Sequence, residues 1–235
     1  MALLPKDLPT MGSRPAWFTA ALFGLVAPTV ALVVLAGAPE AASLAVIGGP
    51  VLALGLMGAG MITAAASGRL WIGVALALLV GAGLLALAKG LGLAGGVPPL
   101  ATGAAMLIGS VSFAVRGALF ARSALDKGWW IAVFVVAGEA AILITAAAAP
   151  GALPDWLLAL LPAQWANRAI QTALGGMGSL AAASALIALA GTAAATLLVA
   201  ALWPRRWPYV IMFSTWLALS ALVYHYPAPP VGGSL

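Results

Sequence analysis

The sequence predicts an all-α integral membrane protein, a bundle of seven transmembrane helices, and three observations lead to this fold class. Seven long apolar stretches fill most of the 235 residues, and the basic residues between them fall on alternate sides. Hydrophobic residues make up 64% of the chain and charged residues only 6%. Because a soluble domain carries about 25% charged residues, we expect a bilayer to surround this apolar surface.

Each apolar stretch supplies the roughly 20 residues that a helix needs to cross a bilayer. The predicted spans are residues 16–37, 41–66, 70–94, 98–120, 129–149, 176–202 and 207–226, which together form one domain, 16–226. Residues 1–15 and 227–235 are predicted to form short tails.

The first span follows Lys6 and Arg14 and ends at Ala36-Gly37-Ala38, which is similar to a signal-peptide cleavage site. However, residues 16–37 exceed the apolar core of a signal peptide, which is about 7–15 residues long. We therefore interpret this span as a retained helix.

The turns between the spans contain residues that end helices or carry charge. They are predicted at Ala38-Pro39-Glu40, Ser67-Gly68-Arg69, Gly95-Gly96-Val97, Asp126-Lys127-Gly128 and Pro204-Arg205-Arg206. Pro28 and Pro50 lie within spans, and we expect the helices to bend there.

The basic residues set the predicted orientation, because cytoplasmic loops of membrane proteins are enriched in Lys and Arg. Only Lys89 and Arg168 fall on one side of the spans. The other side receives Lys6, Arg14, Arg69, Arg116, Arg122, Lys127, Arg205 and Arg206. We predict a cytoplasmic N-terminus and an external C-terminus, and the Ala- and Gly-rich composition favours a multi-pass protein of a bacterial inner membrane.

Tryptophans recur near predicted membrane interfaces, where their amphipathic rings are enriched. The predicted anchors are Trp17, Trp71, Trp129, Trp130, Trp165 and Trp207. Most of them follow a basic residue at the start of an odd-numbered span. This recurrence has two interpretations, independent anchoring or a duplicated helical hairpin.

Residues 150–175 interrupt the series of spans and contain an amphipathic segment. From Pro162 to Leu174, Trp165 and Ile170 share an apolar face, whereas Gln164, Asn167, Arg168 and Gln171 share a polar one. We predict a helix that lies flat at the outer membrane boundary. Plain surface packing and a lid over an outward-facing cavity are both compatible with this pattern.

Small residues at four-residue spacing predict close helix contacts, because lipid is as apolar as the helices and burial alone cannot drive their association. Such stripes are Gly73-xxx-Ala77-xxx-Gly81, Gly60-xxx-Ala64 and Ser184-xxx-Ala188-xxx-Thr192. They indicate contacts within the monomer or a seam in a homo-oligomer.

Glu139 is the candidate ion or proton site, because it lies in the middle of the fifth span, where a charged side chain is costly. Its predicted partner is Arg116. Counted from the turn near Asp126, the two residues differ in depth by only about three residues, or roughly 4.5 Å. Glu139 would be a titratable gate controlled by Arg116, or a buried carboxylate that sets helix register.

Absences in the sequence exclude several kinds of site. The chain has no cysteine and one histidine, His225, so we predict no metal or cofactor site. Its basic residues lie at the ends of the predicted spans, where they set orientation, so we predict no nucleic-acid partner. The predicted partners are the bilayer and either a second copy or a larger membrane complex.

Three functions remain open. The first is transport of a small or proton-coupled solute that uses Glu139, and the alternative is a non-catalytic accessory subunit of a membrane complex. A lipid-acting enzyme is less favoured, and a polar pocket gathering Asp155, Arg168 and His225 would support it.

Overall fold

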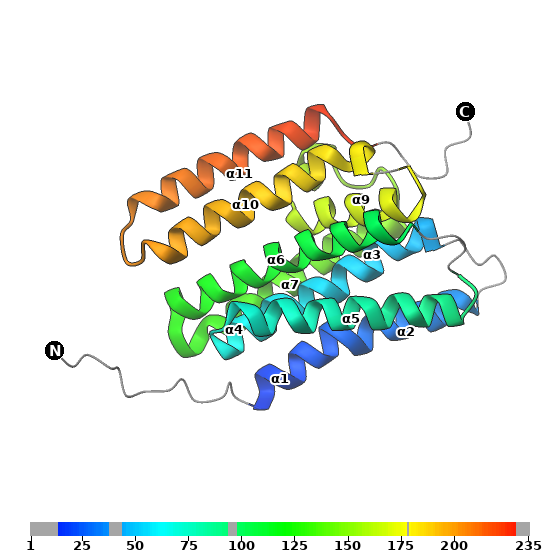
Figure 1. The fold of residues 1–235 in the computed structure, drawn as a ribbon, viewed down its shortest axis with the longest axis horizontal. Coiled ribbons are helices and arrows are strands. Elements are labelled where there is room, and N and C mark those ends of the chain that lie inside the picture. Colours follow the sequence, from blue (N-terminus) through cyan, green and yellow to red (C-terminus); the bar gives the residue numbers. More distant parts are fainter. Residues whose placement is uncertain (1–13, 38–43, 94–97, 178, 229–235) are drawn as a thin grey trace.

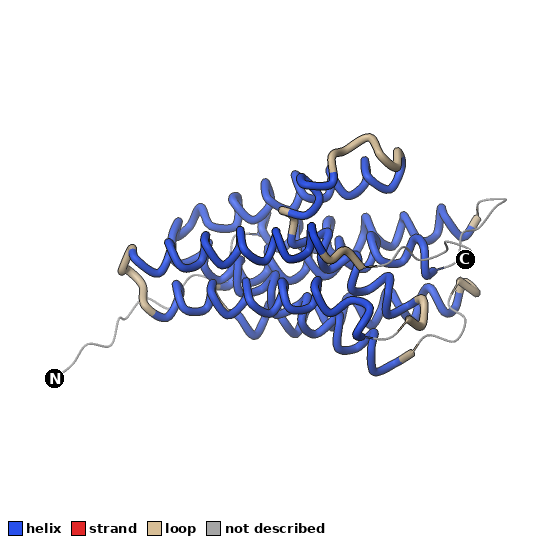
Figure 2. Tube along the Cα trace, turned by 90° about the horizontal axis from the view of Figure 1, so that it is seen from above, coloured by secondary structure: helices blue, strands red, loops and turns tan. Residues whose placement is uncertain are grey.

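The computed structural model describes residues 14–37, 44–93, 98–177 and 179–228. Every regular element within these residues is a helix, and the long helices lie lengthwise beside one another in a bundle (Figure 1, Figure 2). By length and composition, six helical segments of the described chain are able to cross a membrane. They are Arg14–Ala36, Gly48–Ser67, Leu70–Gly90, Pro99–Ala148, Leu180–Ala201 and Trp207–His225. This finding supports a polytopic membrane protein.

The first two segments each contain a π-helical turn. The first segment consists of α1 (Arg14–Ala21), the turn Leu22–Val26 and α2 (Ala27–Ala36). The second lies within α3 (Leu44–Met57), the turn Gly58–Ile62 and α4 (Thr63–Ser67). A π-helical turn interrupts the regular pattern of backbone hydrogen bonds. The first one ends two residues before Pro28, which has no N–H to donate.

The remaining long helices form hairpins. They are α5 (Leu70–Gly90), α6 (Pro99–Ala124), α7 (Gly128–Ala148), α10 (Ala183–Ala201) and α11 (Trp207–His225). The segment Pro99–Ala148 consists of α6 and α7, which double back at a short turn beginning with Leu125, where φ is +49°. The predicted turn at Gly68 is present with φ of +65°. Predicted turns at 38–40 and 95–97 lie outside the described residues.

The small-residue stripes of α5 and the second segment pack against each other. A Cβ added at Gly73 would lie 2.6 Å from the carbonyl oxygen of Gly60 and 2.7 Å from the Ala64 side chain. Gly60 in turn faces Ala77. The structure therefore assigns these two stripes to a contact inside the monomer, and the second segment becomes the most buried of the six.

The helix predicted at Pro162–Leu174 is present with those bounds as α9, but its polar face is not turned outward. Gln164 and Asn167 are only 6% and 7% exposed. The helix packs chiefly against α3 and also contacts α6 and α10 (Figure 1). Gly49 makes this approach possible, because a Cβ there would collide with Gln171 and Asn167. Two of the four polar side chains are therefore buried against the bundle, whereas Arg168 and Gln171 are partly exposed.

Candidate functional site

Arg116 and Glu139 form the ion pair that joins α6 to α7. The Arg116 Nη1 donates to Glu139 Oε1 at 3.1 Å, and this is the one ion pair found among the described residues. The guanidinium also lies over the Phe113 ring, 4.9 Å from its centroid, and Nε donates to the Ser112 carbonyl oxygen at 3.5 Å. These contacts leave the arginine little freedom to turn away from Glu139.

The second oxygen of Glu139 holds the start of α9. The backbone N–H of Ala163, in the first turn of that helix, donates to Glu139 Oε2 at 2.9 Å. Helix N-termini attract negative charge through their unpaired N–H groups and the helix dipole. Glu139 thus serves as a capping carboxylate supplied by another helix, and it places the first turn of α9 beside the middle of α7.

The irregular backbone before α9 is also held by side chains. Between the short helix α8 (Asp155–Ala159) and α9, the carbonyl oxygen of Leu160 accepts a hydrogen bond from Trp216 Nε1 at 3.1 Å. Trp165 Nε1 donates to the carbonyl oxygen of Ala159 at 2.8 Å. These bonds satisfy carbonyl groups that a low-dielectric interior would otherwise leave unpaired.

The Glu139 carboxylate is sealed from the cavities around it. The residue is 8% exposed, and it does not belong to the lining of either of the two cavities described below. Its neighbours on α7 do line the larger one, namely Val136, Ala140 and Leu143. Glu139 therefore supports a cavity wall without facing the space inside.

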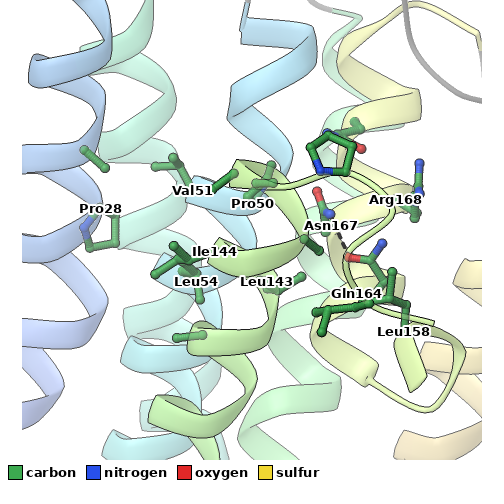
Figure 3. Close-up of a pocket in the computed structure, with 18 of the residues that line it drawn as sticks. Pro28, Pro50, Val51, Leu54, Leu143, Ile144, Leu158, Gln164, Asn167 and Arg168 are labelled. Atoms are coloured by element: carbon green, nitrogen blue, oxygen red, sulfur yellow. Dashed lines mark hydrogen bonds between the residues drawn. The ribbon is translucent and has the colours of Figure 1, made fainter. Parts of the chain in front are cut away.

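The larger cavity lies between α2, α3, α7 and α9 and has a volume of about 730 Å³. Figure 3 shows Pro28 of α2 on one side of it, with Pro50, Val51, Leu54, Leu143 and Ile144 between that proline and α9. This size falls in the range of about 300–1,000 Å³ that is typical of ligand pockets. Most of its wall is apolar.

One end of the larger cavity is polar, and α9 supplies most of the polar groups. Gln164, Asn167, Arg168 and Gln171 line it together with Asp155 of α8. Asn167 Nδ2 donates to Gln164 Oε1 at 2.9 Å (Figure 3). The wall therefore has an apolar part and a polar part, which is the arrangement that an amphipathic molecule requires.

A second cavity of about 500 Å³ adjoins this polar end, because Asp155, Leu158, Gln164 and Arg168 line both cavities. On its other side lie Tyr224, His225 and Pro227. The three residues named in the enzyme hypothesis, Asp155, Arg168 and His225, thus share one cavity. Within the described residues, no group of three or more His, Asp or Glu side chains is arranged to hold a metal ion.

No protein-family model, curated protein or solved structure matches this chain.

Four of the predicted tryptophan anchors begin helices at one end of the bundle. Trp17, Trp71, Trp129 and Trp207 lie in the first turns of α1, α5, α7 and α11, and each of these helices begins at its left-hand end in Figure 1. Trp130 follows directly and is half exposed. Trp165 is instead fully buried, and it cannot anchor the protein at an interface.

The larger cavity was not predicted from the sequence, although one signal for it was present. The polar face assigned to the 162–174 helix, namely Gln164, Asn167, Arg168 and Gln171, is the polar end of this cavity. Polar side chains on a helix in an otherwise apolar chain indicate either water or a cavity. Of the two interpretations of the 162–174 helix, only that of a lid over an outward-facing cavity linked its polar face to a cavity.

Proposed function

We propose that the protein is a seven-span carrier that binds an amphipathic solute in the cavity between α2, α3, α7 and α9. The observation that carries this proposal is the wall of that cavity, apolar along α2, α3 and α7 and polar along α9. In the proposed topology α6 and α7 cross the membrane separately. The predicted cytoplasmic side is the end that holds Arg69, Lys127, Arg205 and the tryptophan-bearing helix starts.

In this topology α9 is a half-length, re-entrant helix. It begins beside the middle of α7 at Glu139 and ends at Leu174, close to the start of α10 at the opposite end from the tryptophans (Figure 1). Irregular backbone at membrane depth is tolerated where it is buried in protein or lines a cavity. The turn between α8 and α9 meets that condition, which supports a solute cavity at this depth.

The sealed position of Glu139 favours a positional role over a role as a proton carrier. Its carboxylate already neutralises Arg116 and the first turn of α9. We propose that it holds α9 at the depth where the polar end of the cavity meets the apolar part.

A tryptophan placed inside the cavity tests the carrier function. Ala141 and Ala147 are both exposed on α7, but only Ala147 lines the larger cavity. In proteoliposomes containing a fluorescent single-chain lipid, dithionite quenching measures transbilayer movement. We expect wild type and Ala141→Trp to accelerate this movement, and Ala147→Trp to slow it several-fold because the indole fills the cavity.

A second candidate, the accessory subunit, is favoured by the same sealed Glu139, since a locked ion pair suits a structural partner. Wild-type proteoliposomes that move the lipid no faster than empty liposomes would contradict the carrier and leave this candidate.

A further inference from the structure

Arg168 lies where the two cavities meet, and it is the half-buried cation of the site. We infer that the cavity selects amphiphiles with an anionic head group, and that Arg168, assisted by Gln164, binds that head. This inference rests on the proposed function, because it names the class of solute that the same cavity would carry.

The Arg168 guanidinium has no protein partner in the part of the chain that the structure describes. It lines both cavities, yet it forms no ion pair and no side-chain hydrogen bond there. Arg116, the other arginine of the bundle interior, is paired with Glu139. A partly desolvated guanidinium favours a carboxylate or phosphate, which it binds through parallel N–H donors.

The Gln164 amide beside Arg168 adds a hydrogen-bond donor. Because Asn167 Nδ2 is bonded to Gln164 Oε1, the Gln164 Nε2 group remains as a donor at the cavity wall. Asn167 Oδ1 is buried and lies against Gly49 of α3, so it does not face the ligand. An anionic head group would use the Arg168 cation and the Gln164 donor together.

The charges around the two cavities favour an anion over a cation. Asp155 and Arg168 line both, and His225 lines the second. Asp155 is exposed, and solvent screens exposed charges. It also lies beyond ion-pair distance of Arg168. Where the two cavities meet, the half-buried positive charge of Arg168 therefore outweighs the exposed negative charge of Asp155.

The apolar wall accounts for the rest of the ligand. It runs from the junction past Leu143, Ile144 and Leu54 toward Pro28 (Figure 3). A hydrocarbon chain attached to the anionic head would lie along this wall, and the burial of each CH₂ group would favour binding. A free anion would leave this wall unused, so the occupant to which we commit is a single-chain lipid.

Two probes with the same chain and different heads test the inference. Dansylamino-undecanoic acid carries a carboxylate, and its methyl ester is neutral. Binding is measured by dansyl emission in nanodiscs holding wild type, Arg168→Gln, Arg168→Lys or Lys89→Gln. Lys89→Gln is the matched control, because it removes an exposed charge near the C-terminal end of α5, outside both cavities.

We expect wild type to bind the acid about tenfold more tightly than the ester, because hydrogen bonds between ionised partners are the stronger ones. Tenfold corresponds to about 1.4 kcal/mol. Arg168→Gln should abolish this preference while still binding the ester. Arg168→Lys should keep part of it, and Lys89→Gln all of it. Size-exclusion profiles check that every variant folds.

The other outcomes separate the two proposals. If wild type binds both probes equally, the anionic selectivity is overturned and the amphiphile cavity survives. If wild type binds neither probe, the carrier fails and the selectivity fails with it. If millimolar inorganic phosphate displaces the acid, the site takes free anions, which contradicts a lipid as the occupant.

Discussion

Glu139 makes two bonds at once, and together they explain why an acid is tolerated in this position. One carboxylate oxygen accepts from Arg116 at 3.1 Å and the other from the Ala163 N–H at 2.9 Å. A buried charge is costly unless it is paired and hydrogen-bonded. The residue therefore connects three elements, α6, α7 and α9, through one side chain.

The Arg116–Glu139 pair predicts a non-additive pair of substitutions. Arg116→Ala and Glu139→Gln should each lower the thermal stability of the detergent-solubilised protein, because breaking a buried pair costs about 3–5 kcal/mol. The double variant should lose less thermal stability than the two single variants lose in total, because it leaves no unpaired charge. Size-exclusion chromatography after heating measures the loss, and simple additivity would argue against a coupled pair.

The capping bond separates two substitutions at Glu139 itself. Glu139→Gln retains an oxygen that accepts from Ala163, whereas Glu139→Ala loses both bonds. Both substitutions are made in an Arg116→Ala background, where the ion pair is already absent and only the bond to Ala163 differs. Because losing a helix cap typically costs about 1 kcal/mol, the protein with Glu139→Ala should be less stable than the one with Glu139→Gln. Equal melting temperatures would show that the cap contributes nothing.

At the scale of elements, glycines decide how closely the helices approach. Gly117 of α6 faces the backbone of Met61 in the π-helical turn Gly58–Ile62, where an added Cβ would collide with the Met61 carbonyl oxygen. Gly103, in the same helix, has nothing within 4 Å of such a Cβ. The two positions share a helix and differ in their surroundings.

Alanine at these two glycines should therefore act in opposite directions. Gly117→Ala should lower the melting temperature, because backbone atoms cannot move aside for the methyl group. Gly103→Ala should leave it unchanged or slightly higher, since alanine is a better helix former by about 1 kcal/mol. Equal effects, measured by the same heating assay, would contradict the close contact at Gly117.

At the scale of the whole molecule, charge is unevenly placed along the bundle. Arg69, Arg122, Lys127 and Arg205 lie at the end where α6 and α7 meet, and Arg122 donates to the carbonyl oxygen of Ala200 there. Lys89 and Arg168 lie toward the other end. By the positive-inside rule, we propose that the more basic end faces the cytoplasm.

Single cysteines test this orientation, because the natural chain contains none. Asp126 and Ala152 are exposed in turns at opposite ends of α7. A membrane-impermeant maleimide added to intact cells should label Ala152→Cys, and should label Asp126→Cys only after permeabilisation. Labelling of Asp126→Cys in intact cells would reverse the proposed topology.

Much of the architecture could be predicted from local pattern. Hydropathy placed the long helices within a few residues of their observed bounds, apart from the later start of α10, and the helix at Pro162–Leu174 was predicted with its observed ends. The proximity of Arg116 to Glu139 also followed from counting residues on either side of a hairpin turn. In each case the information lies within one helix or two consecutive ones.

The burial of α9, the cap on its first turn and the two cavities depend on segments far apart in the chain. Gly49 must meet Asn167, and His225 must come to lie near Arg168. Hydropathy could not predict these contacts between distant segments, because lipid and the protein interior are equally apolar. Side chains that face lipid therefore resemble side chains that face another helix. Only the rotation and packing of the helices against one another turn the polar face of α9 into the end of a cavity.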